Sequence, residues 1–260
     1  MRSTQALANK HALVTGGGRG IGAAIAQQLL LHGARVSLVG RNPAPLASTA
    51  AALAQFGEVD YFTADIAQRA SVTQAFEQAR ARFGNIAILV NNAGQAASAP
   101  FMKTDEALWQ QMLSVNLSGT FHCTQDALPD MLAANWGRIV NVVSTAGLTG
   151  YAYVAAYCAA KHGVIGLTRS LALEMATKGI TVNAVCPGYT ETDIVKDALA
   201  NIVAKTGRTA QQARADLAAG NPQKRLVQPE EVAHAVLWLC LPGSDAMNGQ
   251  ALAVAGGEIM

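Results

Sequence analysis

Charge is scarce in this chain of 260 residues. Only 14% of the residues are charged, and nineteen Lys and Arg against seventeen Asp and Glu leave a formal net charge of +2, with no long run of one sign. Because nucleic acids and anionic membrane surfaces are bound through concentrated basic charge, we expect neither as a partner. Apolar residues make up 51% of the chain, enough to fill one large core, so we expect a single domain over residues 1–260.

Cysteine and long apolar runs are also scarce. The four cysteines form no CxxC pair and no metal-ligand spacing with the five histidines, so we expect reduced thiols and no metal site. No stretch reaches the roughly eighteen apolar residues of a membrane span, and the first residues lack the apolar region of a signal peptide. These absences predict a cytoplasmic protein without a membrane anchor.

Short apolar, β-branched runs alternate with helical patterns along the whole chain. Continuous apolar runs of this kind are typical of buried parallel strands. We predict strands at 11–15, 35–39, 59–62, 86–90, 138–143, 180–185 and 251–254. The alternation predicts an α/β fold, namely a doubly wound parallel sheet of the Rossmann type with helices on both faces. Ligands of such a sheet bind beyond the carboxyl ends of its strands.

Residues 193–224 interrupt this alternation with a long, mostly helix-forming stretch. We predict that they form a helical lid over the active site. The apolar residues of the lid either cover a substrate or seal the lid onto the body; they are Ile194, Val195, Leu199, Ile202, Val203 and Leu217.

A glycine-rich turn follows the first predicted strand and opens a helix. The turn contains Gly16, Gly18, Arg19, Gly20, Ile21 and Gly22. Backbone N–H groups at such a helix start attract a pyrophosphate, and glycines let the backbone approach it closely. The spacing G-x-x-x-G-x-G differs from the G-x-G-x-x-G fingerprint, and a purely structural turn is the alternative. The position between a strand and a helix nevertheless favours a dinucleotide site.

The end of the second predicted strand bears on the choice of nicotinamide cofactor. An acidic side chain there binds the ribose hydroxyls of NAD and repels the 2′-phosphate of NADP. This chain has Gly40 followed by Arg41, and both Arg41 and Arg19 can meet a phosphate through charge-assisted contacts. We therefore predict a preference for NADP(H), with NAD(H) as the alternative. Two solvated arginines on exposed loops would carry no such preference.

A phenol and an ammonium suggest the chemistry. Tyr157 and Lys161 are four positions apart, so they share one face of a predicted helix, and Ser144 precedes them. An ammonium beside a phenol lowers the phenol's pKa. A free tyrosine titrates near ~10, so an acid poised near ~7 requires about 4 kcal/mol of added stabilisation of the phenolate. Alone, the pair is more typical of an ordinary amphipathic helix. Beside a dinucleotide site it predicts a proton donor.

Together these motifs resemble the short-chain dehydrogenase/reductase family over residues 10–257. The residues that carry the resemblance are Thr15, Gly16, Gly20, Gly22, Asn91, Asn92, Ala93, Gly94, Asn116, Ser144, Tyr157, Lys161, Pro187 and Gly188. It implies that Tyr157 donates the proton in ketone reduction and that Ser144 holds the substrate carbonyl. It also implies that Lys161 binds the nicotinamide ribose and lowers the pKa of Tyr157, while Asn116 holds a water molecule of a proton relay.

The same resemblance implies further cofactor contacts along the chain. Those residues are Asp65 and Ile66 for the adenine, Asn92, Ala93 and Gly94 for the adenosine ribose, and Pro187, Gly188, Thr190 and Thr192 for the carboxamide. For Thr190 the contact implied is through the backbone N–H. Family members are commonly tetramers, so a homotetramer is expected.

Residues 157–163 and 179–188 look most like 3-oxoacyl thioester reductases, polyketide ketoreductases and 3-hydroxybutyrate-type dehydrogenases. This narrower resemblance implies a small ketone or alcohol substrate carried by coenzyme A or an acyl carrier. Basic residues of the lid region either contact coenzyme phosphates or form a solvated face; they are Lys196, Lys205, Arg208, Arg214, Lys224 and Arg225.

Two alternatives stay open at this point. One is an NAD-dependent dehydrogenase of another small alcohol, sugar or aromatic ketone. The other is a dinucleotide sensor that keeps the fold without turnover. The usual sign of such a sensor is a broken catalytic set, and here Asn116, Ser144, Tyr157 and Lys161 are all present.

Overall fold

Seven parallel strands form the centre of the computed structural model, which describes residues 5–192, 195, 199–200, 203–204 and 207–259. Their order in the sheet is β3-β2-β1-β4-β5-β6-β7. The strands are β1 (His11–Thr15), β2 (Arg35–Gly40), β3 (Val59–Thr63), β4 (Ile86–Asn91), β5 (Gly137–Val142), β6 (Ile180–Pro187) and β7 (Ala251–Val254). All seven predicted strands are confirmed, and their ends differ from the prediction by at most two residues.

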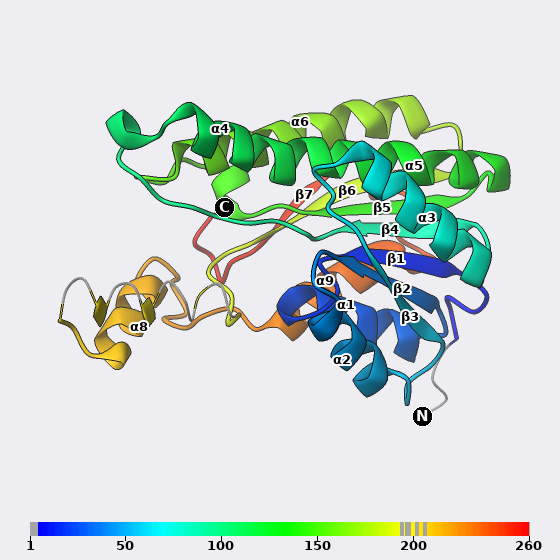
Figure 1. Ribbon diagram of the computed structural model, residues 1–260, viewed down its shortest axis with the longest axis horizontal. Helices are drawn as coiled ribbons and strands as arrows, with labels where there is room; N and C mark the ends of the chain where they lie inside the picture. Colours follow the sequence, from blue (N-terminus) through cyan, green and yellow to red (C-terminus); the bar gives the residue numbers. More distant parts are fainter. Residues whose placement is uncertain (1–4, 193–194, 196–198, 201–202, 205–206, 260) are drawn as a thin grey trace.

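Helices cover both faces of this sheet (Figure 1). They are α1 (Gly20–Leu31), α2 (Pro43–Leu53) and α9 (Pro229–Cys240) on one face, and α3 (Arg69–Phe83), α4 (Glu106–Leu113), α5 (Gly119–Ala134) and α6 (Ala155–Met175) on the other. Successive side chains of a strand point to opposite faces, so the neighbours Leu13 and Val14 of β1 lie in two different apolar cores. Both are 0% exposed. Burial on both faces is why the strands are continuous apolar runs.

The winding of the sheet reverses between β1 and β4. From β1 the chain proceeds outward through β2 to β3, and it then returns to β4 on the other side of β1 and continues to β7. The connections that leave β1 and β4 therefore diverge at the carboxyl ends of these strands. In open α/β sheets this divergence creates the crevice in which ligands bind.

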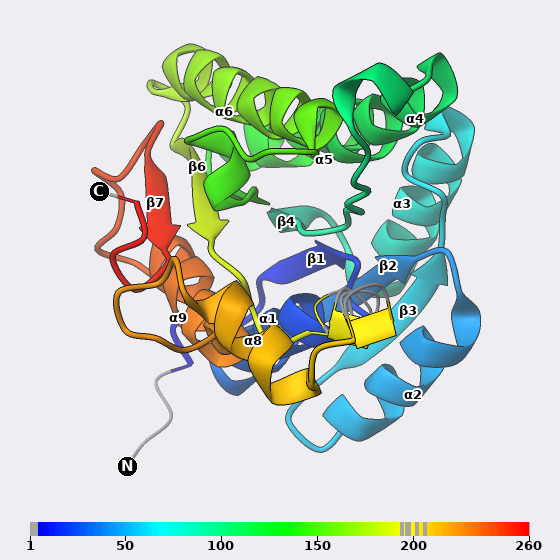
Figure 2. The ribbon, with the colours of Figure 1, turned by 90° about the vertical axis from the view of Figure 1, so that its left-hand side faces the viewer.

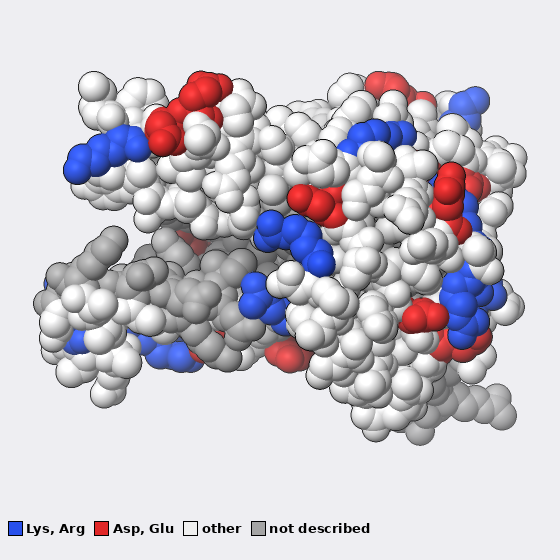
Figure 3. All heavy atoms as spheres, viewed as in Figure 1, with Lys and Arg blue, Asp and Glu red and all other residues white. Residues whose placement is uncertain are grey.

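The segment predicted to be a lid is described in part. Its described helix is α8 (Ala210–Ala218), which starts with a capping box formed by Thr209 and Gln212. Figures 1 and 2 show α8 on a lobe beyond the carboxyl ends of the strands. Figure 3 shows a cleft between this lobe and the one that carries α4, and on this face charges of both signs are scattered.

The apolar residues of this lobe contact one another. Val195, Ala218 and Leu226 are buried together, with Leu199 and Leu217 packed against them. This small cluster supports sealing of the lobe as the role of these side chains. The predicted lid residues Ile194, Lys196, Ile202 and Lys205 lie outside the described residues.

A buried histidine lies at the amino ends of the strands, opposite the ligand crevice. His11 begins β1; its Nε2 is 2.8 Å from the Ser37 hydroxyl and its Nδ1 is 2.8 Å from the Gly84 carbonyl oxygen. Its ring packs edge-on against Phe83, with 5.5 Å between the ring centroids. Burial lowers the pKa of His11 to about 4, because the charged imidazolium loses its hydration.

We expect the free energy of unfolding to fall as the pH is lowered from 6.5 to 4. In this window the unfolded chain takes up a proton on His11, whereas the folded protein does not, so acid favours unfolding by up to roughly 3 kcal/mol. Urea unfolding at pH 7.5, 5.5 and 4 measures the effect. His11→Gln should make the dependence shallower, while His162→Gln, at an exposed position, should keep it. An equally steep dependence in His11→Gln would assign the effect to other groups.

Candidate active site

The turn after β1 packs its backbone tightly. At Gly22 an added Cβ would lie 2.2 Å from the Gly16 carbonyl oxygen, and at Gly16, whose φ is +66°, it would lie 2.8 Å from the Asn92 amide nitrogen. Helix α1 then starts at Gly20 without a side-chain cap and without an acidic residue in its first turn. Such a helix start offers backbone N–H groups and the positive end of the helix dipole to an anion. This geometry fits the pyrophosphate of a dinucleotide.

Hydrogen bonds join this turn to the end of β4. Nδ2 of Asn92 donates to the carbonyl oxygens of Thr15 at 3.0 Å and Gly16 at 3.2 Å. The backbone N–H groups of Asn92 and Ala93 both donate to the Thr15 hydroxyl, at 3.1 and 3.0 Å. The Asn92 side chain therefore builds the crevice between β1 and β4, in addition to any contact with a ligand.

The residues expected around the adenine and its ribose lie on the same edge of the sheet. Arg19 and Arg41 are exposed, at the glycine turn and directly after β2. The side chain of Ile21 packs against the first core and that of Ile66 lies in the second. Asp65 accepts a hydrogen bond from the Ala67 N–H at 3.0 Å, which holds the turn after β3.

Gly18 and the loop after β6 complete the edge. An added Cβ at Gly18 would lie 3.2 Å from the backbone nitrogen of Leu46 in α2. An added Cβ at Gly20 would lie 3.2 Å from the methyl group of Thr192. The segment from Pro187 through Gly188 and Thr190 to Thr192 therefore runs from β6 to the glycine turn. Within it, the Thr190 hydroxyl donates to the Gly188 carbonyl at 2.9 Å, and the Thr192 hydroxyl donates to the Thr190 carbonyl at 3.2 Å.

Asn116 lies in a π-helical turn, η2 (Ser114–Ser118), between α4 and α5. Its side chain is buried; Oδ1 accepts from the Gln95 N–H at 3.1 Å, and Nδ2 donates to the carbonyls of Gln95 at 2.9 Å and Met112 at 3.0 Å. Turns of this type widen a helix by one residue and are frequent at functional sites. Here the widened turn binds the backbone that follows Gly94.

Gly94 lets two predicted catalytic side chains approach each other. An added Cβ at Gly94 would lie 2.8 Å from Oδ1 of Asn116 and 3.6 Å from Nζ of Lys161. Lys161 is buried, and its ammonium donates to the Val142 carbonyl at 3.0 Å and lies 5.7 Å from the centroid of the Tyr157 ring. A side chain larger than hydrogen at position 94 would therefore displace one of these groups.

Ser144 follows the end of β5 and brings its hydroxyl to the phenol of Tyr157. A hydrogen bond links its hydroxyl to the phenol of Tyr157. Its Oγ also accepts from the Ala146 N–H at 3.1 Å, which caps the short helix η3 (Thr145–Gly147). The structure thus brings the four predicted catalytic residues together, although they come from three separate parts of the chain.

The titration of the pair differs from the sequence-based expectation. Burial raises the pKa of Tyr157 to about 12, and the hydrogen bond with Ser144 only partly opposes this shift. Burial likewise lowers the pKa of Lys161 to about 8. The predicted depression of the phenol's pKa is therefore wrong for this structure. Desolvation disfavours the charged form of both groups and is the largest cause of both shifts.

The basic residues around α8 form ion pairs. Arg208 pairs with Asp216, Arg214 with Glu191, and Arg225 with Glu231. The Lys224 ammonium donates to the Ala219 carbonyl at 2.8 Å. Arg225 also holds the pKa of Glu231 down, at about 2. These exposed pairs support a solvated, internally balanced face and weaken the interpretation as a site for coenzyme phosphates.

Two polar residues at the site escaped the sequence analysis. The Tyr151 hydroxyl donates to Oε1 of Glu258 at 2.5 Å and lies 2.8 Å from the Thr145 hydroxyl. An added Cβ at Gly188 would lie 2.8 Å from Oε2 of Glu258. No local pattern predicts a contact between residues that are 107 positions apart in the chain.

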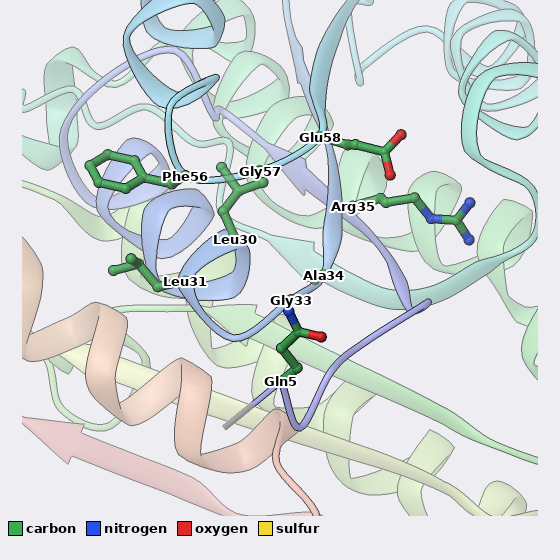
Figure 4. Close-up of a pocket in the computed structure, with 9 residues that line it drawn as sticks. All are labelled: Gln5, Leu30, Leu31, Gly33, Ala34, Arg35, Phe56, Gly57 and Glu58. Carbon is green, nitrogen blue, oxygen red and sulfur yellow. The ribbon is translucent and has the colours of Figure 1, made fainter. Parts of the chain in front are cut away.

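A separate hollow of about 280 Å³ lies on the side of the sheet opposite the ligand crevice (Figure 4). It is lined by Gln5, Leu30, Leu31, Gly33, Ala34, Arg35, Phe56, Gly57 and Glu58. Because Arg35 begins β2, this hollow is at the amino ends of the strands. None of the predicted site residues lines it.

A dinucleotide crevice with a buried ammonium beside a half-buried phenol and hydroxyl, at the carboxyl ends of a doubly wound sheet, defines a nucleotide-dependent oxidoreductase. The comparison with protein families is more specific. The chain belongs to the short chain dehydrogenase family, whose sequence model matches residues 10–202. It is accordingly an NAD(P)-dependent dehydrogenase or ketoreductase. Among the described residues, no helix has both the length and the hydropathy to cross a bilayer.

Relatives of known name match almost the whole chain. A D-beta-hydroxybutyrate dehydrogenase of Cupriavidus necator is 37% identical and aligns over 97% of this chain and 99% of its own. A 3-oxoacyl-(acyl-carrier-protein) reductase of Aquifex aeolicus is 36% identical, over 96% and 98%. The solved structure of an actinorhodin polyketide ketoreductase variant with NADPH is 38% identical, with a TM-score of 0.92 over 96% and 97% of the two chains.

We expect Gly22→Ala to abolish dinucleotide binding. The added methyl group would overlap the Gly16 carbonyl oxygen, and relieving the overlap opens the turn at a cost of about 1–3 kcal/mol. Gly166→Ala is the matched control, because an added Cβ there has no described atom within 4 Å apart from its chain neighbours and the backbone of its own helix. It should bind normally and gain about 0.5–1 kcal/mol from helix propensity.

Calorimetric titration with NADPH, on variants shown to be folded by circular dichroism, measures this difference. Wild-type affinity in a folded Gly22→Ala would place the pyrophosphate elsewhere.

Proposed function

We propose that this protein, as a single catalytic domain, interconverts a ketone and a secondary alcohol with NADP(H). The observation that carries the proposal is the Ser144 and Tyr157 pair beside Lys161, at the edge of the sheet where the glycine turn opens. When bound, the dinucleotide supplies or accepts the hydride, and the protein supplies geometry and a proton.

In this proposal Tyr157 donates the proton. Its pKa of about 12 keeps the phenol protonated at neutral pH, which is the form that ketone reduction requires. Ser144, already bonded to the phenol, holds the substrate's carbonyl oxygen within reach of the same proton. At neutral pH the resting form of Tyr157 is therefore the form that donates a proton in reduction.

Lys161 and Asn116 serve the cofactor side of the site. The Lys161 ammonium is buried next to Gly94. Gly94 belongs to the segment that is expected to lie along the adenosine ribose. We assign the ammonium to the hydroxyls of the nicotinamide ribose. Asn116 holds the backbone around Gln95 and, with Lys161, forms the start of the proton relay.

The preference for NADP(H) rests on the residues after β2 and in the glycine turn. Gly40 provides no carboxylate to bind ribose hydroxyls, and the exposed Arg41 and Arg19 lie at the same edge of the sheet. Gly18, the neighbour of Arg19, packs against the start of α2, so the backbone of the glycine turn lies close to the residues that follow β2. A charge-assisted pair with a 2′-phosphate is the contact that these residues can make.

For the substrate we propose 3-oxoacyl or 3-hydroxyacyl thioesters. The support is similarity to a protein named as a 3-oxoacyl-(acyl-carrier-protein) reductase and to a polyketide ketoreductase. Similarity to a hydroxybutyrate dehydrogenase makes a free hydroxy acid the competing class. We also propose a homotetramer, supported by exposed apolar side chains on α5 and α6, namely Phe121, Leu132 and Leu173.

Tyr157→Phe should lower kcat for NADPH-dependent reduction of acetoacetyl-CoA by about 10²–10⁴-fold, because the proton donor is removed. The dissociation constant for NADPH should change less than about threefold, since the ring remains. Stopped-flow absorbance and NADPH fluorescence measure the two quantities. Tyr153→Phe, at a side chain that is 66% exposed, serves as the control. Near-normal kcat in Tyr157→Phe would show that the acid is another group.

Arg41→Ala should weaken NADPH binding by about tenfold or more and change NADH binding less than about twofold. The reason is the loss of one charge-assisted contact with the 2′-phosphate, worth about 1.5–3 kcal/mol. Fluorescence titration with both nucleotides gives the ratio. Arg82→Ala, at the end of α3 on the opposite edge, should leave it unchanged. Equal losses for the two nucleotides would show that Arg41 does not select the phosphate.

A further inference from the structure

The last turn of the chain carries a carboxylate toward the substrate side of the site. Gly256 and Gly257 have φ values of +61° and +91°, and the Glu258 N–H donates to the Ala255 carbonyl at 3.1 Å. At Gly256 an added Cβ would lie 2.3 Å from Oδ1 of Asn221. The turn is therefore held against the segment that follows α8, which fixes the direction of the Glu258 side chain.

The Glu258 carboxylate is hydrogen-bonded to one segment next to the catalytic residues and lies close to two others. One is the stretch between Ser144 and Tyr157, through the hydrogen bond from Tyr151. The second is the loop after β6, where an added Cβ at Gly188 would lie 2.8 Å from Oε2. The third is the end of the α8 lobe, where an added Cβ at Gly220 would lie 3.7 Å from Oε1.

The charge of this carboxylate acts on two tyrosines at the edge of the site. After burial, the charge and hydrogen bond of Glu258 raise the pKa of Tyr151, and its charge raises that of Tyr189. Tyr189 in turn contributes to the raised pKa of Tyr157. Thr145, which contacts Tyr151, directly follows Ser144.

The charge of Glu258 is not balanced. Within the described part of the chain, no Lys or Arg forms an ion pair with it, whereas the neighbouring arginines of the α8 lobe each have a carboxylate of their own. A second carboxylate brought close to this one would be repelled, while an ester or thioester would not.

We infer that Glu258 determines substrate charge, so that the enzyme accepts 3-oxo esters and thioesters and rejects the corresponding free 3-oxo carboxylates. This inference rests on the proposed function, since it names the substrate class of the same site. The Tyr151 hydroxyl positions the carboxylate, and the absence of a side chain at Gly188 makes room for it.

Glu258→Gln tests the charge alone, because the amide keeps the size of the side chain and still accepts from Tyr151. The substrates are methyl acetoacetate and acetoacetate, which share a carbon skeleton and differ in charge, together with acetoacetyl-CoA, all with NADPH. Wild type should favour the ester over the acid by about tenfold or more in kcat/KM. Glu258→Gln should raise kcat/KM for the acid about tenfold and change that for the ester less than threefold.

Two further measurements keep the test decisive. Glu174→Gln, at an exposed position of α6, should leave the ester-to-acid ratio unchanged. Raising the salt concentration from 0.02 to 0.5 M should reduce the ratio in wild type and not in Glu258→Gln, because salt screens the repulsion. This comparison in wild type remains informative even where Glu258→Gln folds poorly.

Each outcome has one meaning. A ratio that Glu258→Gln leaves unchanged, or that salt does not alter in wild type, overturns the inference while Tyr157-dependent turnover of the ester upholds the proposed function. Absence of turnover of all three substrates by wild type overturns the proposed function and the inference together.

Discussion

The hydrogen bonds between Thr15 and Asn92 are the constraint on which the site depends. They join the ends of β1 and β4 where the winding of the sheet reverses, so that two diverging loops keep a defined separation. The glycine turn lies on one side of this junction. On the other side, Gly94 lies next to the side chains of Asn116 and Lys161. The junction therefore fixes the position of the glycine turn relative to the catalytic side chains.

Burial dominates the electrostatics of the catalytic pair. Both shifts favour the neutral form, to about 12 for the Tyr157 phenol and about 8 for the Lys161 ammonium, which is the signature of desolvation. The Lys161 ammonium is satisfied by the Val142 carbonyl. The protein thus keeps the phenol protonated for proton donation at neutral pH.

The charged side chains on the two sides of the substrate cleft have different kinds of partner. On the exposed lobe around α8, arginines and carboxylates pair with one another, and such surface pairs contribute little to stability or to recognition. Beside the stretch between Ser144 and Tyr157, Glu258 has the Tyr151 hydroxyl as its partner and forms no ion pair with a described Lys or Arg. In our proposals, selection therefore comes from a single carboxylate placed close to the reacting carbonyl, and the more numerous charges of the lobe have no part in it.

The sequence by itself determined the features that depend on local order. Apolar and β-branched runs predicted all seven strands, and in the central strands burial on both faces removes polar positions. The glycine turn followed from its place between strand and helix, and helical spacing put Tyr157 and Lys161 on one face. Only the tertiary structure decided the pKa of Tyr157, the pairing of the lobe's arginines and the contact of Tyr151 with Glu258. These depend on desolvation and on distances between segments far apart in the chain, which no local pattern encodes.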